Sequence, residues 1–178
     1  LSLHDALPIL DSFDTALRSA MREDPDVILV GEMRDYETIA AVVTLAETGH
    51  LVFSTLHTIG AAKTIDRIID VFPPHRQEQI RMQVSGILKA VITQQLLPKR
   101  DGSGRIAALE VMIGTDAISS MIRENKVHQI NSIIQTGMRE GMQSLNFALA
   151  RLVRNGMVTR EVAEKYSDDP QELKQYLQ

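Results

Sequence analysis

Residues 27–57 read VILVGEMRDYETIAAVVTLAETGHLVFSTLH, and this stretch decides the fold. Its first four residues, 27–30, form an unbroken apolar run, which is typical of a strand covered on both faces. Asp35 is placed to cap a helix from 36 to about 48, and residues 51–56 are predicted to form a second buried strand. A strand, a helix and a strand within about 30 residues predict a βαβ unit with parallel strands and a right-handed crossover.

A polar residue follows each of these strands, Glu32 after the first and His57 after the second. Because ligands collect at the carboxyl ends of parallel strands, we expect the two side chains to meet on one rim of the sheet. The carboxylate is suited to hold a Mg²⁺-bound water or to orient the water that attacks a phosphate. The imidazole is suited to donate a hydrogen bond to a terminal phosphate or to Glu32. Either residue alone is more often a solvated loop residue, but as a pair they form the candidate catalytic and cofactor-binding site.

Two other patterns do not predict a site. If residues 50–57 are extended, the α-carbons of His50 and His57 lie roughly 23 Å apart, so one metal ion cannot bind both. The chain has no compact cluster of metal ligands, and we place His50 at the opposite end of its strand in a structural or subunit-contact role. Residues 60–64, GAAKT, lack the glycine that precedes the lysine of a P-loop, and Lys63 is predicted to be solvated.

The rest of the chain predicts an α/β core, residues 11–114, followed by a small helical subdomain, residues 115–178. Two antiparallel strands are expected at 96–98 and 105–113, with a turn between them. One helix is expected to carry apolar side chains on a single face, namely Ile80, Val84, Ile87, Leu88 and Val91. The other expected helices are 13–21, about 60–69, 116–125, 127–135, 144–154, 160–166 and 170–177.

The composition is that of a soluble globular protein, with 44% apolar and 24% charged residues in a chain of 178. A net charge of −4 and the absence of tryptophan argue against a nucleic-acid partner. The chain has no cysteine, which excludes disulfides and thiolate metal sites. No apolar stretch approaches the about 20 residues of a transmembrane segment, and we expect a cytoplasmic protein. The chain begins at Leu1, and residues 1–10 resemble a translated sequencing adapter, so we expect a non-native leader there.

Two long motifs resemble the motor ATPases of secretion systems and type IV pili. Residues 22–35, REDPDVILVGEMRD, resemble the Walker B segment of that superfamily, and residues 48–58, TGHLVFSTLHT, resemble the histidine box that follows it. Further stretches resemble its retraction branch, the type IV pilus retraction ATPase (PilT) family: VFP at 71–73, QEQIR at 77–81, GTDAI at 114–118 and IRE at 122–124. The resemblance covers residues 11 to about 177.

This resemblance implies the carboxyl-terminal part of a RecA-like P-loop ATPase core in a cytoplasmic homohexamer that uses ATP and Mg²⁺. It implies a motor that drives pilus retraction through an inner-membrane pilus platform protein, as a peripheral protein at the inner face of the cytoplasmic membrane. Glu32 corresponds to the catalytic Walker B glutamate and His57 to the histidine that approaches the γ-phosphate. His50 corresponds to the other histidine of the box, and Arg34 and Asp35 belong to the Walker B motif.

A motif tied to retraction is matched near the carboxyl end of the chain by Ala117, Ile118, Ile122, Arg123 and Glu124. The family usually has Arg-Asn where this chain has Ser119-Ser120, and this departure concerns the retraction role rather than the ATPase assignment.

The family also has a P-loop and an amino-terminal regulatory domain, which these 178 residues do not contain. We therefore expect the isolated chain not to hydrolyse ATP. Three alternatives stay open at this point: a pilus-extension or type II secretion ATPase of the same superfamily, a nucleic-acid translocase, and a non-catalytic interaction module built from residues 115–178.

Overall fold

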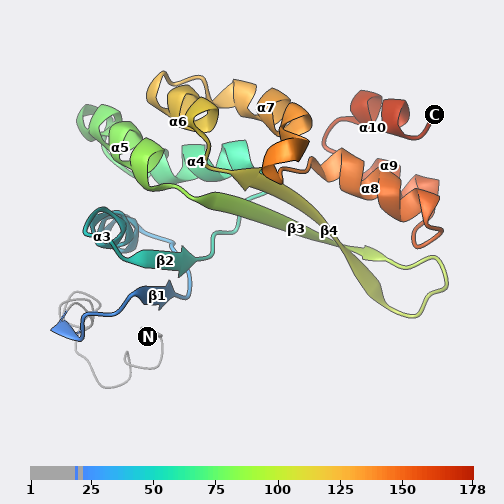
Figure 1. The fold of residues 1–178 in the computed structure, drawn as a ribbon. Coiled ribbons are helices and arrows are strands. Elements are labelled where there is room, and N and C mark those ends of the chain that lie inside the picture. The colour runs from blue at the N-terminus through green and yellow to red at the C-terminus, as the bar shows by residue number, and fades with distance from the viewer. Residues whose placement is uncertain (1–18, 20–21) are drawn as a thin grey trace. The chain divides into compact units, whose positions relative to one another are not determined.

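The computed structural model describes residue 19 and residues 22–178 (Figure 1). They form two compact units. The parallel-strand unit contains the described residues up to Thr58 together with Asp66–Ile87, and the hairpin unit contains Ile59–Ile65 together with Leu88–Gln178. The predicted leader 1–10 and most of the predicted helix 13–21 lie outside the described residues.

The parallel-strand unit is built on the predicted βαβ segment. Strands β1 (Val27–Val30) and β2 (Leu51–Ser54) are parallel, with Val27 opposite Leu51 and Val30 opposite Ser54. Helix α3 (Tyr36–Glu47) connects them and packs on one face of the pair. The core between helix and sheet consists of Ile28, Val30 and Leu45, which are at most 2% exposed. The parallel pairing predicted from the sequence is confirmed.

The expectation that both strands are covered on both faces is wrong for the part of the chain that the structure describes. On the face away from α3, Val27, Leu29, Leu51 and Phe53 are between 43% and 55% exposed. The reason is the strand periodicity: alternate side chains point to opposite faces, and α3 covers only one of them. An unbroken apolar run therefore does not by itself show that both faces are buried.

Helices α4 (Ala61–Asp70) and α5 (Pro74–Ile87) follow β2. Helix α5 lies beside α3, where the Tyr36 and Phe72 rings pack edge to face with centroids 5.0 Å apart. Our predicted helix included Leu88 and Val91, and this was wrong, because α5 ends at Ile87 and Val91 belongs to a strand. The β-branched residues that begin at Val91 pair across a hairpin, and this pairing outweighs their helical spacing.

The hairpin unit contains two long antiparallel strands, β3 (Ala90–Pro98) and β4 (Arg105–Ile113). The predicted hairpin is confirmed, although β3 begins before the expected residue 96. One face of the ribbon is covered by helices (Figure 1), and its side chains Leu97, Ala108, Glu110 and Met112 are at most 4% exposed.

The carboxyl-terminal segment is helical, as predicted. Its elements are α6 (Asp116–Arg123), the 3₁₀ turn η2 (Val127–Gln129), α7 (Ile130–Thr136), the 3₁₀ turn η3 (Gly137–Glu140), α8 (Leu145–Arg154), α9 (Arg160–Tyr166) and α10 (Pro170–Tyr176). Side-chain caps begin four of these helices and satisfy amide groups that have no partner within the helix. The caps are Thr115, Ser144, Thr159 and Asp169.

The two compact units divide at a different place from the boundary we predicted near residue 115. The hairpin groups with the carboxyl-terminal helices because Leu97 and Ala108 share one buried cluster with Leu145 and Leu149 of α8. That residues 115–178 form a subdomain of their own stays a prediction.

Candidate functional site

Glu32 and His57 meet at the carboxyl ends of β1 and β2. Glu32 lies two residues beyond Val30, and His57 lies three residues beyond Ser54. Their side chains are joined by a hydrogen bond of 3.1 Å between His57 Nε2 and Glu32 Oε2. The predicted meeting of an acidic side chain and an imidazole on a common rim is therefore confirmed. Their catalytic and nucleotide-binding roles stay predictions.

The two strand exits are held together by the residue Thr55. Its hydroxyl donates to the carbonyl oxygen of Gly31 at 2.6 Å, and its own carbonyl oxygen accepts from the Met33 amide at 2.9 Å. These bonds lie on either side of Glu32 and extend the pairing of the strands past their last residues. The Glu32 side chain is 29% exposed and the His57 side chain 81% exposed, so the imidazole lies in solvent above a partly sheltered carboxylate.

Arg34 adds a second contact to the same carboxylate oxygen. Its Nε lies 2.8 Å from Glu32 Oε2, the atom that also bonds His57. The hydrogen bond from Arg34, and then that from His57, lower the pKa of Glu32 below its usual range. The carboxylate is consequently ionised near neutral pH, as required of a group that binds a cation or orients a water molecule.

Asp35 and His50 have local structural roles. The Asp35 carboxylate accepts from the Thr38 amide at 2.8 Å and caps α3 as predicted, and this bond lowers the pKa of Asp35. His50 precedes β2 and lies at the other end of that strand from His57. Its Nδ1 is 3.0 Å from the Leu45 carbonyl oxygen, which only accepts, so Nδ1 carries the proton. His50 thus binds a carbonyl oxygen near the end of α3 that also accepts from the Thr48 hydroxyl and from the His50 amide.

The residues of the predicted retraction motif divide between the two sides of α6. Ile118 and Ile122 are buried, at 0% and 1% exposure, whereas Ala117, Arg123 and Glu124 are exposed. Their functional role stays a prediction.

The Ser-Ser departure from the family pattern lies next to this motif. The Nη2 atom of Arg123 donates to the hydroxyl of Ser120 at 3.2 Å. Glu124 pairs with Lys126 at 2.7 Å, which lowers the pKa of Glu124. Ser120, one of the two serines that differ from the family pattern, therefore hydrogen-bonds to Arg123 of the motif.

Sequence reasoning did not identify Glu110, a glutamate in β4 that is 4% exposed. Its Oε1 accepts a hydrogen bond of 2.7 Å from the amide of Ala61, the first residue of α4. Burial raises the pKa of Glu110, the Ala61 amide lowers it, and Asp168 and Glu172 raise it further. Strand alternation places Glu110 on the same face as the buried Ala108 and Met112, and a charge at such a position was the signal that could have revealed it.

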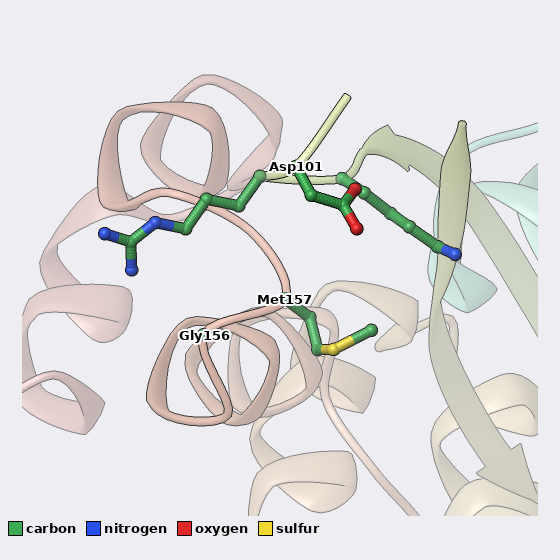
Figure 2. A pocket seen from close by; sticks show the side chains of 5 residues that line it. Asp101, Gly156 and Met157 are labelled. Carbon is green, nitrogen blue, oxygen red and sulfur yellow. The ribbon is translucent and has the colours of Figure 1, made fainter. Parts of the chain in front are cut away.

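A pocket of about 330 Å³ lies beside the β3–β4 turn, lined by Lys99, Arg100, Asp101, Gly156 and Met157 (Figure 2). The Arg100 amide donates to the Met157 carbonyl oxygen at 2.8 Å and joins the turn to the loop after α8.

No group of three or more His, Asp or Glu side chains able to hold a metal ion occurs within residue 19 and residues 22–178. Over the same residues, the helices are all too short or too polar to cross a bilayer.

Comparisons with known proteins agree with these features. A twitching motility protein of Neisseria gonorrhoeae is 54% identical over 162 residues, which cover 91% of this chain and 43% of that protein. The type IV pilus retractation ATPase PilT of Pseudomonas aeruginosa is 56% identical over 159 residues, covering 89% of this chain and 46% of that protein. The crystal structure of the pilus retraction motor PilT with bound ADP matches with a TM-score of 0.83 at 50% identity, over 93% of this chain and 46% of that one.

The chain spans less than half the length of these relatives. The α/β fold matches the solved motor, and the family model described as Type II/IV secretion system protein matches residues 9–167. The chain belongs to the type II/IV secretion system protein family.

Proposed function

We propose that this chain is the carboxyl-terminal part of an ATP-hydrolysing motor that drives retraction of type IV pili. The observation that carries the proposal is the hydrogen bond of 3.1 Å between Glu32 and His57 at the carboxyl ends of two parallel strands. In open α/β sheets this edge is where phosphate ligands bind. Close relatives named for twitching motility and for pilus retraction match about nine tenths of the chain, which supports retraction as the output.

Each residue of this rim has a distinct role in the proposal. Glu32 is the catalytic carboxylate, which holds a Mg²⁺-bound water or orients the water that attacks the terminal phosphate. His57 donates a hydrogen bond either to Glu32 or to that phosphate, so its partner depends on whether the phosphate is present. Arg34 holds Glu32 in its ionised form.

ATP with Mg²⁺ is the proposed cofactor, and the described residues suit part of its site. An ionised carboxylate and an exposed imidazole face the same rim, which fits the metal and the γ-phosphate end of the nucleotide. The 178 residues contain no P-loop to hold the β- and γ-phosphates. We therefore propose that the isolated chain does not hydrolyse ATP, whereas a protein that also carries a P-loop does.

The proposal includes the setting in which the motor works. It acts as a homohexamer in the cytoplasm, at the inner face of the cytoplasmic membrane, and its partner is the inner-membrane platform protein of the pilus machine. The exposed part of α6, with Arg123 and Glu124, is the motif that we assign to retraction. Nucleic acid is not a partner in this proposal, because the net charge is −4.

The decisive experiment is genetic, in the organism that encodes the chain. Disrupting the reading frame should abolish twitching motility while pili remain on the surface, because a retraction motor is not needed for pilus assembly. Complementation with the intact gene should restore twitching, and complementation with Glu32→Gln should not. The loss of surface pili would identify an extension ATPase, and a secretion defect with normal twitching would identify a secretion ATPase.

A biochemical arm uses the purified chain. Titration with Mg²⁺-ATP should show no micromolar affinity, because the P-loop is absent from these residues. Tight, Mg²⁺-dependent binding would contradict the proposal that these residues supply only part of the nucleotide site. Salt-sensitive binding of DNA would favour a translocase instead.

A further inference from the structure

We propose that Arg34 and His57 together form a clamp for a terminal phosphate, and that the Glu32 carboxylate occupies this clamp until a phosphate arrives. The ligand class is a phosphate dianion, free in solution or at the end of a nucleotide. The proposal rests on the function proposed above and deepens it, because it gives Arg34 a phosphate-binding role and makes the contacts of Glu32 depend on the ligand. All three residues belong to the parallel-strand unit.

Both donors of the clamp meet the same atom of Glu32. Arg34 Nε lies 2.8 Å and His57 Nε2 lies 3.1 Å from Glu32 Oε2. Because an ionised carboxylate only accepts hydrogen bonds, Nε2 of His57 carries the proton in this contact. The two nitrogen atoms therefore converge on one anionic oxygen, and a phosphate oxygen at that position would meet the same two N–H groups.

The guanidinium of Arg34 is suited to bind more than one oxygen atom. A guanidinium has five N–H donors in a planar fork, which matches the oxygen atoms of a phosphate in a bidentate manner. The contact with Glu32 uses Nε, and the Arg34 side chain is 70% exposed. The fork can thus be reached from the solvent side, and a tetrahedral phosphate satisfies it better than a single carboxylate oxygen does.

The two donors can move while the carboxylate stays in place. The side chains of Arg34 and His57 are 70% and 81% exposed, whereas that of Glu32 is 29% exposed. Thr55 hydrogen-bonds to the residues on either side of Glu32 and so fixes the backbone that carries the carboxylate. Since exposed ion pairs contribute little stability, moving both donors to an incoming dianion costs little.

This exchange of partners changes what Glu32 can do. A carboxylate oxygen has two lone pairs, and the two donors fill both of those on Oε2. Oε2 therefore has no lone pair for a water molecule until the donors leave. Glu32 is released to orient water when a phosphate is bound, and the clamp keeps the carboxylate occupied in its absence.

The test is a titration of the chain as it is with inorganic phosphate, followed by nitrogen-15 NMR of backbone amides and side chains. It involves neither hydrolysis nor pili, so its failure is distinct from failure of the proposed function. The wild type should bind phosphate weakly, with shifts at Arg34 Nε and His57 Nε2. Arg34→Gln and His57→Gln should each weaken binding about fivefold, because each removes one donor of the clamp.

Glu32→Gln distinguishes a clamp with a built-in competitor from an ordinary basic patch. It should bind phosphate about fivefold more tightly than the wild type, since a neutral amide competes less well for the two donors. Asp35→Asn is the matched control, because it removes a negative charge next to Arg34 from a side chain that caps α3, and it should change the affinity less than about twofold. Arg22→Gln removes an exposed positive charge before β1 and controls in the same way for the charge lost at Arg34.

The proposal is overturned if the Arg34 and His57 signals of the wild type do not respond to phosphate. Wild-type affinity in Glu32→Gln would overturn it as well, and so would an equal gain in Asp35→Asn, because Glu32 would then act only through its charge at a distance. Binding of ATP without binding of inorganic phosphate would assign recognition to another part of the nucleotide and contradict the clamp. In each of these cases the genetic test of the motor is unaffected.

Discussion

Replacing Gly114 by alanine tests a close approach of two backbone segments in the hairpin unit. Gly114 follows β4 and precedes α6, and its amide donates to the Lys89 carbonyl oxygen at 2.7 Å. A β-carbon built on Gly114 overlaps the Leu88 carbonyl oxygen and lies 3.2 Å from that of Lys89. These are backbone atoms at the entrance to β3, so they cannot move aside as a flexible side chain does.

The expected loss follows from this geometry. The two backbones must separate by more than about 1 Å to reach an ordinary van der Waals distance. Overpacking of this kind costs about 1–3 kcal/mol, and losing the bond between Gly114 and Lys89 costs about 1 kcal/mol more. We therefore expect Gly114→Ala to lower the free energy of unfolding by about 2–4 kcal/mol.

The assay is guanidinium denaturation followed by far-ultraviolet circular dichroism, with Gly86→Ala as the matched control. Gly86 lies in α5, and a β-carbon there meets nothing within 4 Å. Its replacement should leave the protein unchanged or stabilise it by up to about 1 kcal/mol, because alanine favours the helix. Hydrogen exchange at Gly114 then locates the effect. If Gly114→Ala unfolds within about 0.5 kcal/mol of the wild type, the steric reasoning is refuted.

Three more predictions concern the site and the core. Asp35→Ala should lower stability by about 1 kcal/mol through loss of the α3 cap, whereas Asp35→Asn keeps the cap, and thermal unfolding compares the two. Arg34→Gln should raise the pKa of Glu32, as followed by carbon-13 titration. Because folding lowers the pKa of Glu32, its contacts stabilise the fold at pH values above its usual pKa of about 4.3. This stabilisation is lost as the pH falls through the native pKa of Glu32. The variant should therefore show a weaker loss of stability on acidification. Asn146→Ala should lower the free energy of unfolding in denaturant by about 2–3 kcal/mol, because the fully buried side-chain amide donates to the Asp169 carbonyl and the Glu172 carboxylate. A loss below about 0.5 kcal/mol would show that water replaces the Asn146 amide.

Much of the fold was predictable because its signals are local. The Asp35 cap, the length of α3 and the two short strand segments lie within neighbouring residues, and they predicted the parallel pair correctly. The same holds for the Asp169-Pro170 start of α10. The meeting of Glu32 and His57 followed from a general rule about the ends of parallel strands.

The errors arose where burial or pairing depends on distant residues. The end of α5 and the start of β3 are set by the pairing of Val91 with Met112, which outweighs an apparent helical spacing. The exposed face of Leu29 and Phe53 depends on which elements cover the sheet, and a run of apolar residues does not contain that information.

By itself, the sequence determined the order of the elements, the Asp35 cap that begins α3 and the two side chains that follow the parallel strands, because each of these depends on residues that are near one another in the chain. Only the tertiary structure decided that Glu110 in β4 caps α4 at Ala61. It also decided that Arg34 and His57 share one oxygen of Glu32. Such contacts depend on how the backbone brings side chains together in space, and local patterns do not record that geometry.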